Sequence, residues 1–266
     1  MIDTHCHLNF SKFKKNLSDI ISEAHSVGVS DIIVPGTDLK HSRKAVEIVK
    51  QYPHLYAAVG IHPHEATKID LAGTLHELET LLKEKKVVAV GEIGMDYHSS
   101  EEYTITDEAK EAQKALFQEQ VKLALMYHKT IIIHNRESKQ DLLPILHTLW
   151  SSSLNNRAVF HCCEPDLELL EFAKDHNMFI GVDGDITYYE EKKQFIKQVP
   201  SQMLVLETDA PFLLPEPFRG RKEYPNKPYH IPFIAKVVAD LRGESVEKLD
   251  AYTTDNARKL FNLPEE

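Results

Sequence analysis

The chain has 266 residues, of which 42% are hydrophobic and 27% are charged, and its formal net charge is -10. This composition is typical of a folded globular protein and excludes a largely disordered chain. The negative charge disfavours broad non-specific binding to duplex nucleic acid, because phosphates are repelled at long range.

Short β-branched segments alternate with longer amphipathic segments along the chain. The spacing of Leu17, Ile20, Ile21 and Ala24 predicts a one-sided helix after the first β-branched segment. The segments expected to form strands are residues 1–7, 31–35, 55–60, 87–92, 130–134, 158–161, 178–182 and 203–207. Eight such βα units close a parallel sheet into an α/β fold of the (β/α)8 TIM-barrel type, which we expect to occupy residues 1–266 as a single domain. No glycine-rich phosphate loop follows the first segment, which disfavours an open doubly wound sheet.

The last part of the chain is expected to contain a long loop and a closing helix. Residues 213–232 hold five prolines and no helical period, so we expect a loop after the eighth strand. Residues 255–261 are expected to form the closing helix, with Thr253 or Thr254 as its N-cap.

The sequence indicates a cytoplasmic location. No apolar stretch approaches the ~20 residues needed to span a bilayer, and the chain does not start with the apolar segment of a secretory signal. The three cysteines, Cys6, Cys162 and Cys163, are too few for a disulfide framework. We expect no membrane contact and no obligate protein partner.

Histidines flank Cys6 at the end of the first expected strand. Residues two apart in a strand point to the same side, so His5 and His7 are expected to converge. Neutral imidazoles bind divalent ions, but an isolated pair of this kind is more often structural.

Residues that can bind metal also stand at the ends of four later expected strands: Glu92, His134 and His161 are the last residues of theirs, and Asp209 follows the eighth by two residues. In a parallel barrel these strand ends share one face, where catalytic residues lie. Each residue alone has a structural alternative, such as a solvated loop acid, a core histidine or a helix cap. The coincidence of six such residues favours a metal-dependent active site.

These residues belong to motifs through which nearly the whole chain resembles the TatD family of metal-dependent deoxyribonucleases, in the amidohydrolase superfamily. The matching motifs are Asp3-Thr4-His5-Cys6-His7-Leu8, Gly60-Ile61-His62-Pro63-His64, Gly91-Glu92-Ile93-Gly94-Met95-Asp96-Tyr97, Ile133-His134-Asn135-Arg136-Glu137, Phe160-His161-Cys162 and Leu206-Glu207-Thr208-Asp209-Ala210-Pro211. The resemblance implies one metal held by His5, His7, Glu92 and Asp209. It implies a second metal held by Glu92, His134 and His161, so that Glu92 is the bridging ligand.

Such a centre indicates hydrolysis by an activated water molecule. One carboxylate can bridge two cations ~3.5–4 Å apart, which neutral histidines cannot do. Mixed imidazole and carboxylate ligation suits Mg²⁺, Mn²⁺ or Zn²⁺. We expect Glu92 and Asp209 to be catalytic, with Asp209 as the general base.

Several residues outside the ligand set are candidates for contacts with the substrate: His62, His64, Arg136, Arg219 and Arg221. The alternatives are ordinary loop histidines for the first two and surface ion pairs or a solvated basic loop for the arginines. Tyr97 can stack a base, although packing is the more frequent role. Asp96, Asp183 and Asp185 are candidates to orient ligand imidazoles.

The chain departs from the family pattern in two places. Cys163-Glu164-Pro165 replace the usual aromatic residue, serine and glycine after His161, and the loop at residues 219–228 is extended. A catalytic role of the cysteines beside His161 is disfavoured because no separate base is indicated. Both departures affect the expected substrate cleft rather than the ligands.

Three functions therefore remain open at this level. The resemblance implies a hydrolase of ester bonds that cleaves phosphodiester bonds in single-stranded DNA, with exonuclease action from the 3′ end as the favoured mode. The same metal centre would also serve cleavage of an aminoacyl-tRNA ester or a small ester or amide. A barrel that binds a ligand without catalysis is the third alternative.

Overall fold

In the computed structural model, which describes residues 1–99 and 104–264, parallel strands follow one another around a single sheet in chain order. The remaining residues of the expected domain 1–266 lie outside the described part. The eight strands of the described part are β1 (Ile2–Asp3), β2 (Asp31–Pro35), β3 (Leu55–Val59), β4 (Val87–Asp96), β5 (Thr130–Arg136), β6 (Ala158–Phe160), β7 (Phe179–Val182) and β8 (Leu204–Leu206). All neighbouring strands in the described part of the chain pair in parallel, as expected from the βα rhythm.

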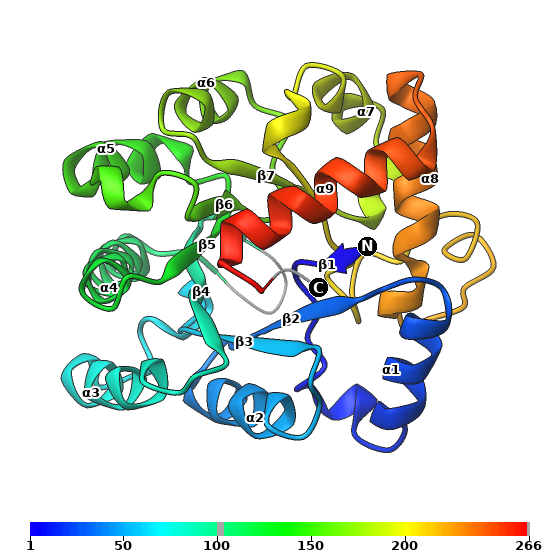
Figure 1. The fold of residues 1–266 in the computed structure, drawn as a ribbon. Helices are drawn as coiled ribbons and strands as arrows, with labels where there is room; N and C mark the ends of the chain where they lie inside the picture. The colour runs from blue at the N-terminus through cyan, green and yellow to red at the C-terminus, as the bar shows by residue number, and fades with distance from the viewer. Residues whose placement is uncertain (100–103, 265–266) are drawn as a thin grey trace.

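The sheet closes into a barrel through backbone contacts between its first and last segments. The backbone N–H of Thr4 donates to the carbonyl of Leu206, and Cys6 forms an isolated parallel bridge with Ala210. The expected TIM-barrel fold is therefore confirmed (Figure 1).

A ring of helices surrounds the strands (Figure 1). The helices are α1 (Leu17–Ser26), α2 (Leu39–Val49), α3 (Leu71–Leu82), α4 (Asp107–Met126), α5 (Lys139–Leu149), α6 (Leu167–Asp175), α7 (Glu190–Ile196), α8 (Ile231–Arg242) and α9 (Val246–Phe261). Several begin at a side-chain N-cap, as where Asp70 accepts from Gly73 and Thr106 from Ala109, which satisfies an otherwise unpaired backbone donor. None of the helices in the described ranges has the length and apolarity needed to cross a membrane.

The interior of the barrel is filled by apolar side chains. Each strand contributes a buried residue to this inner cluster: Ile2, Ile33, Ala58, Ala89, Ile132, Val159, Phe179 and Val205. At one end, Ala257, Leu260 and Phe261 of α9 join the cluster, and Figure 1 shows α9 crossing the strands there. This end of the barrel is therefore plugged, and the opposite end, where the strands terminate, is the one that can hold a site.

Some expected boundaries were wrong. β1 is limited to Ile2–Asp3, because the chain beyond it forms only isolated backbone hydrogen bonds with the neighbouring segments. The closing helix begins at Val246, with Ser245 as its N-cap, since Thr253 lies inside the helix and donates to the carbonyl of Leu249. The loop after β8 ends earlier than expected, because Pro232 occupies the first turn of α8, where its missing N–H costs nothing.

Candidate metal centre

A cavity of about 970 Å³ opens at the carboxyl ends of the strands, and we call it the central cavity. The structure brings the six residues predicted as ligands together here. Five of them line the cavity, namely His7, Glu92, His134, His161 and Asp209, and His5 is completely buried beside them.

Glu92 lies in the middle of this group, and its two oxygens face different partners. Its Oε2 atom lies 3.6 Å from His5 Nε2 and 3.8 Å from His7 Nε2. Its Oε1 atom lies 2.8 Å from His134 Nδ1 and 3.8 Å from His161 Nε2. Burial alone would raise the pKa of Glu92, but the surrounding histidines, His62 first, hold it well below its ordinary value.

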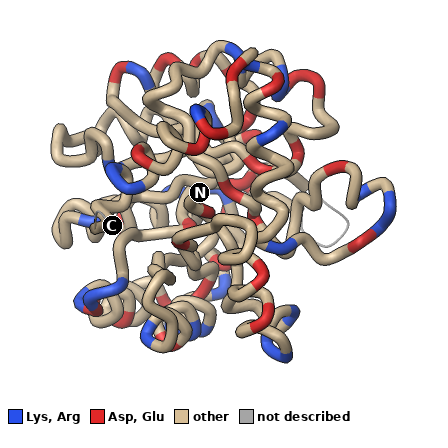
Figure 2. The backbone as a smooth tube through the Cα atoms, turned by 45° about the vertical axis from the view of Figure 1, so that its right-hand side comes forward, with Lys and Arg blue, Asp and Glu red and all other residues tan. Residues whose placement is uncertain are grey.

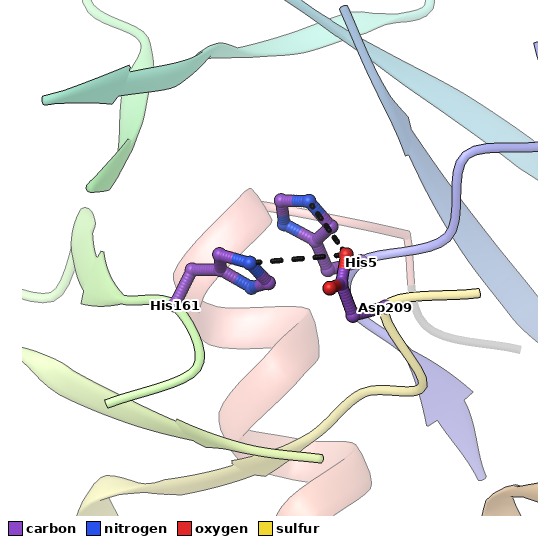
Figure 3. Close-up of side chains that lie close together, drawn as sticks. All are labelled: His5, His161 and Asp209. Carbon is purple, nitrogen blue, oxygen red and sulfur yellow. Dashed lines mark ion pairs between the residues drawn. The ribbon is translucent and has the colours of Figure 1, made fainter. Parts of the chain in front are cut away.

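Asp209 completes the group from the β8 side. Its Oδ1 atom lies 3.3 Å from His7 Nε2, 3.7 Å from His5 Nε2 and 3.9 Å from His161 Nε2; the last two pairs are drawn in Figure 3. Asp209 adopts a left-handed backbone conformation with φ of 50°, which aspartate tolerates better than most residues. Its N–H donates to the carbonyl of His5, which keeps the two strand ends together.

The donor set fits divalent metal ions. Within the described ranges, groups of three residues with ligand atoms less than 4.8 Å apart include His5, His7 and Glu92 on one side and Glu92, His134 and His161 on the other. Burial lowers the pKa of His7 to about 4 and also lowers those of His5 and His161, so these rings are neutral near pH 7. A neutral imidazole is the form that binds metal.

Asp96 supports His134 from the side opposite Glu92. His134 Nε2 lies 3.1 Å from Asp96 Oδ2, and its Nδ1 lies 2.8 Å from Glu92 Oε1. Burial alone would lower the pKa of His134, but the hydrogen bonds to Asp96 and Glu92 raise it to about 10. The ring therefore carries a proton on each nitrogen, and a metal at Nδ1 would replace the proton that faces Glu92. The Oδ2 atom of Asp96 also lies 3.2 Å from His64 Nε2. Asp96 was one of three acids considered from the sequence for this role, and its side chain is only 2% exposed.

Glu207 was missed by the sequence analysis. Its Oε1 atom lies 2.9 Å from His161 Nδ1 and accepts the backbone N–H of Cys162. A side chain at Gly181 would come within 2.6 Å of this oxygen, so the glycine leaves room for the carboxylate. Burial raises the pKa of Glu207 to about 7. The available signal was its position directly after the apolar strand Leu204–Leu206, at the end of the barrel where the other ligand-type residues lie.

Asp3 connects the first and last strand ends beneath the cavity. It accepts hydrogen bonds from the Thr208 backbone N–H at 3.0 Å and hydroxyl at 2.6 Å, and from the His5 N–H at 3.3 Å. Burial raises the pKa of Asp3 to about 8. These hydrogen bonds fix the position of the backbone at His5 and next to Asp209.

The other acids considered from the sequence form a separate buried cluster. Lys192 of α7 lies 2.6 Å from Asp185 Oδ2 and 3.6 Å from Asp183 Oδ2, so the ammonium group sits between the two carboxylates. Its Nζ also donates to Cys162 Sγ at 3.5 Å. Asp183 and Asp185 therefore contact Lys192 and do not contact a ligand imidazole.

Of the two cysteines beside His161, Cys163 is buried and Cys162 is partly buried. Burial raises the pKa of Cys162 well above its ordinary value and that of Cys163 as well, which keeps both protonated. A thiolate nucleophile is disfavoured by this environment, as expected from the sequence.

The predicted substrate contacts divide into two groups. His62, His64 and Arg136 line the central cavity. Arg219 and Arg221 are not among its lining residues; Arg219 lies over the Tyr188 ring at 4.3 Å, and Arg221 pairs with Glu223. Their substrate roles remain predictions.

Tyr97 has the packing role that was favoured for it. It is partly buried, and its hydroxyl donates to Asp141 at 2.7 Å. The ring is therefore fixed outside the group of residues that lines the central cavity.

Known proteins resemble this chain over almost its full length. A family model described as TatD related DNase matches residues 2–262. A Bacillus subtilis protein named uncharacterized metal-dependent hydrolase YabD is 33% identical over 99% of both chains, and a Salmonella typhimurium protein named 3′-5′ ssDNA/RNA exonuclease TatD is 30% identical over the same share. The solved structure of YjjV, a TatD homologue from Escherichia coli, is 33% identical with a TM-score of 0.89, covering 99% of this chain and 98% of its own.

Proposed function

The chain belongs to the TatD related DNase family of metal-dependent hydrolases that act on ester bonds, and on this premise we propose that it cleaves phosphodiester bonds of single-stranded DNA from the 3′ end. The two-sided arrangement of Glu92 is the observation that carries the proposal. One oxygen faces His5 and His7, and the other faces the histidines of β5 and β6. A carboxylate placed in this way fits a bridging role between two cations.

In this proposal, His5, His7, Glu92 and Asp209 hold one divalent ion, and Glu92, His134 and His161 hold the other. The ions, taken as Mg²⁺, Mn²⁺ or Zn²⁺, supply Lewis acidity for the attacking water and for the departing oxygen. Asp209 takes the proton of the water at its carboxylate. Burial raises the pKa of Asp209 to about 7, and a base near the working pH transfers protons efficiently.

His62 is proposed to donate a hydrogen bond to the phosphate. Its Nδ1 accepts the backbone N–H of His64 at 3.2 Å, which places the ring proton on Nε2. Burial lowers the pKa of His62 to about 3, so the ring is a neutral donor near pH 7. Arg136, exposed at the cavity rim and without an ion pair to any acid in the described ranges, is proposed as a second phosphate contact.

The location of the protein is part of the same proposal. Cys6, Cys162 and Cys163 are all free thiols in the structure. Free cysteines are usual in reducing compartments, which supports the cytoplasm.

End-labelled oligonucleotides test the function directly. Single-stranded DNA should shorten stepwise from its 3′ end with added Mn²⁺ or Mg²⁺ and remain intact with a chelator. RNA, aminoacyl-tRNA and small esters form the comparison panel, because the same centre is chemically able to hydrolyse them. The names of the relatives do not favour tRNA esters or a binding barrel without catalysis. Turnover of small esters alone would contradict the nuclease proposal.

A further inference from the structure

A row of hollows leads away from the central cavity on the side of β1 and β8. Phe10 and Phe212 line both the central cavity and a hollow of about 400 Å³. Lys12 and Tyr224 line this hollow and also a further one of about 500 Å³, which Lys227 borders. We call the surface formed by these five residues the aromatic track.

The rings of the track are available for stacking. Phe212 is 50% exposed and Tyr224 is 59% exposed, whereas most large apolar side chains of the described residues are buried. Phe10 links the track to the candidate ligands, because its ring stacks on His7 with centroids 4.6 Å apart and meets Phe212 edge-on at 6.0 Å. Exposed aromatic rings in succession are the surface on which single-stranded bases stack.

The charges beside the track are positive. Lys12, Lys14 and Lys15 are exposed on and next to the short helix η1 (Ser11–Phe13), and none forms an ion pair within the described ranges. Lys227 lies over the Tyr229 ring at 5.1 Å. The acid of the track region, Glu223, is paired with Arg221 at 3.8 Å. Phosphates can therefore bind here.

The other side of the central cavity is acidic. The loops and helix that follow β5, β6 and β7 contribute Glu137, Glu164 and Glu191 to the cavity lining. Lys192 on this side is neutralised by its buried aspartates, which leaves Arg136 as the cation available there. Figure 2 shows acidic and basic residues interspersed over the molecule, so the difference between the two sides is local. An anionic strand leaving the cavity is repelled on the acidic side and attracted toward Lys12.

We propose that the aromatic track binds the nucleotides on the 5′ side of the scissile bond in single-stranded DNA. Bases stack on Phe212 and Tyr224, and backbone phosphates contact Lys12 and Lys227. The inference rests on the proposed function for its substrate class, and it adds a binding surface outside the candidate metal centre.

Substitution of Tyr224 tests the aromatic track without altering the candidate metal centre. Tyr224→Ala should raise KM for oligonucleotides of six or more nucleotides about 5- to 150-fold, as expected for the loss of one stacked base. Its kcat, and its activity on bis(p-nitrophenyl) phosphate, should equal those of the wild type, because a small diester does not reach the track. Tyr224→Phe should restore the low KM. The matched control is Phe233→Ala on α8, whose ring is 42% exposed and lines neither the central cavity nor the two hollows of the track.

The lysine contacts are tested by salt dependence. Lys12→Gln should reduce the slope of log KM against log salt by about 0.7, the value for one phosphate contact with a single strand. Lys197→Gln, an exposed lysine at the C-terminal end of α7, is the matched control.

Binding measured with a chelator present distinguishes failure of the track from failure of the proposed function. Fluorescence anisotropy of a labelled oligonucleotide should show weaker binding by Tyr224→Ala, whether or not the wild type cleaves it. Equal binding by both proteins, or no binding by the wild type, would overturn the track. Absence of cleavage with every metal, together with Tyr224-dependent binding, would overturn the nuclease proposal and leave the track in place.

Discussion

Replacing Asp96 by asparagine tests how the candidate metal centre is organised. Asp96 accepts the ring proton of His134 at Nε2, which leaves Nδ1 directed toward Glu92. Asparagine has nearly the same shape but is neutral, and its amide can donate as well as accept. Asp96→Asn therefore should keep the fold but no longer specify which nitrogen of His134 is free for metal.

The expected loss of metal affinity can be given a size, because Asp96 is a carboxylate that orients a ligand histidine. Loss of a carboxylate that orients a ligand histidine typically lowers metal affinity about 10- to 100-fold. This range corresponds to about 1.4–2.7 kcal/mol of binding free energy. We expect the upper part of the range, because the Asp96 side chain is only 2% exposed and solvent screens the interaction weakly.

Calorimetric titration of the metal-free protein with Mn²⁺ measures this change for the ion held by His134. Activity of Asp96→Asn should recover at high Mn²⁺ concentration if the defect lies in metal affinity. Asp141→Asn is the control, since this acid binds Tyr97 and Lys114 away from the centre. A Kd within twofold of the wild type, in a variant with unchanged thermal stability, would refute the reasoning.

Three further substitutions test other parts of the structure. Asp209→Asn should fold normally but lose about 10²–10⁴-fold in kcat at saturating metal, and a near-wild-type rate would exclude it as the general base. Lys192→Met should lower the free energy of unfolding in urea by about 3–5 kcal/mol, because two buried carboxylates lose their partner. The control Lys193→Met should change it little, because Lys193 is only partly buried and its partner Glu190 lies at the surface. Burial lowers the pKa of His230 from 6.5 to about 4, so the unfolded chain takes up the proton first and stability falls as pH drops through this window. His230→Asn should therefore remove about 2 kcal/mol of the stability loss between pH 7 and pH 5, and identical losses in both proteins would contradict this origin.

The fold was largely predictable because the strands are buried on both sides. Segments such as Asp31–Pro35 form largely apolar runs between helical patterns. For that segment, the bounds expected from the sequence are the same as those of β2. The end of β1 was less predictable, because no regular ladder of hydrogen bonds continues beyond Asp3. His5 and His7 each form one backbone hydrogen bond to the segment beyond β8, with Asp209 and Ala210 respectively, and Cys6 forms one to Ile33 of β2. The start of α9 was also missed, because its first turns after Ser245 are polar and lack a clear apolar period.

The residues of the candidate metal centre also differ in how clearly the sequence marks them. Those that directly follow apolar strands, such as His134 after Ile133 and His161 after Phe160, are marked in the sequence by an abrupt change from apolar to polar residues. Glu207 also directly follows an apolar strand, but its role depends on a contact with His161 from another strand, which the sequence does not show. The aromatic track depends still more on the fold, since Phe10 and Tyr224 come together only when the loop after β8 lies against η1.

The plug formed by Ala257, Leu260 and Phe261 has a kinetic consequence for a nuclease. A barrel sealed at one end has a single mouth, so an excised mononucleotide departs through the same opening by which the strand entered. The strand cannot advance by one position until the nucleotide has left. Mononucleotides should therefore act as competitive product inhibitors, which raise the apparent KM for the strand as they accumulate and leave kcat unchanged.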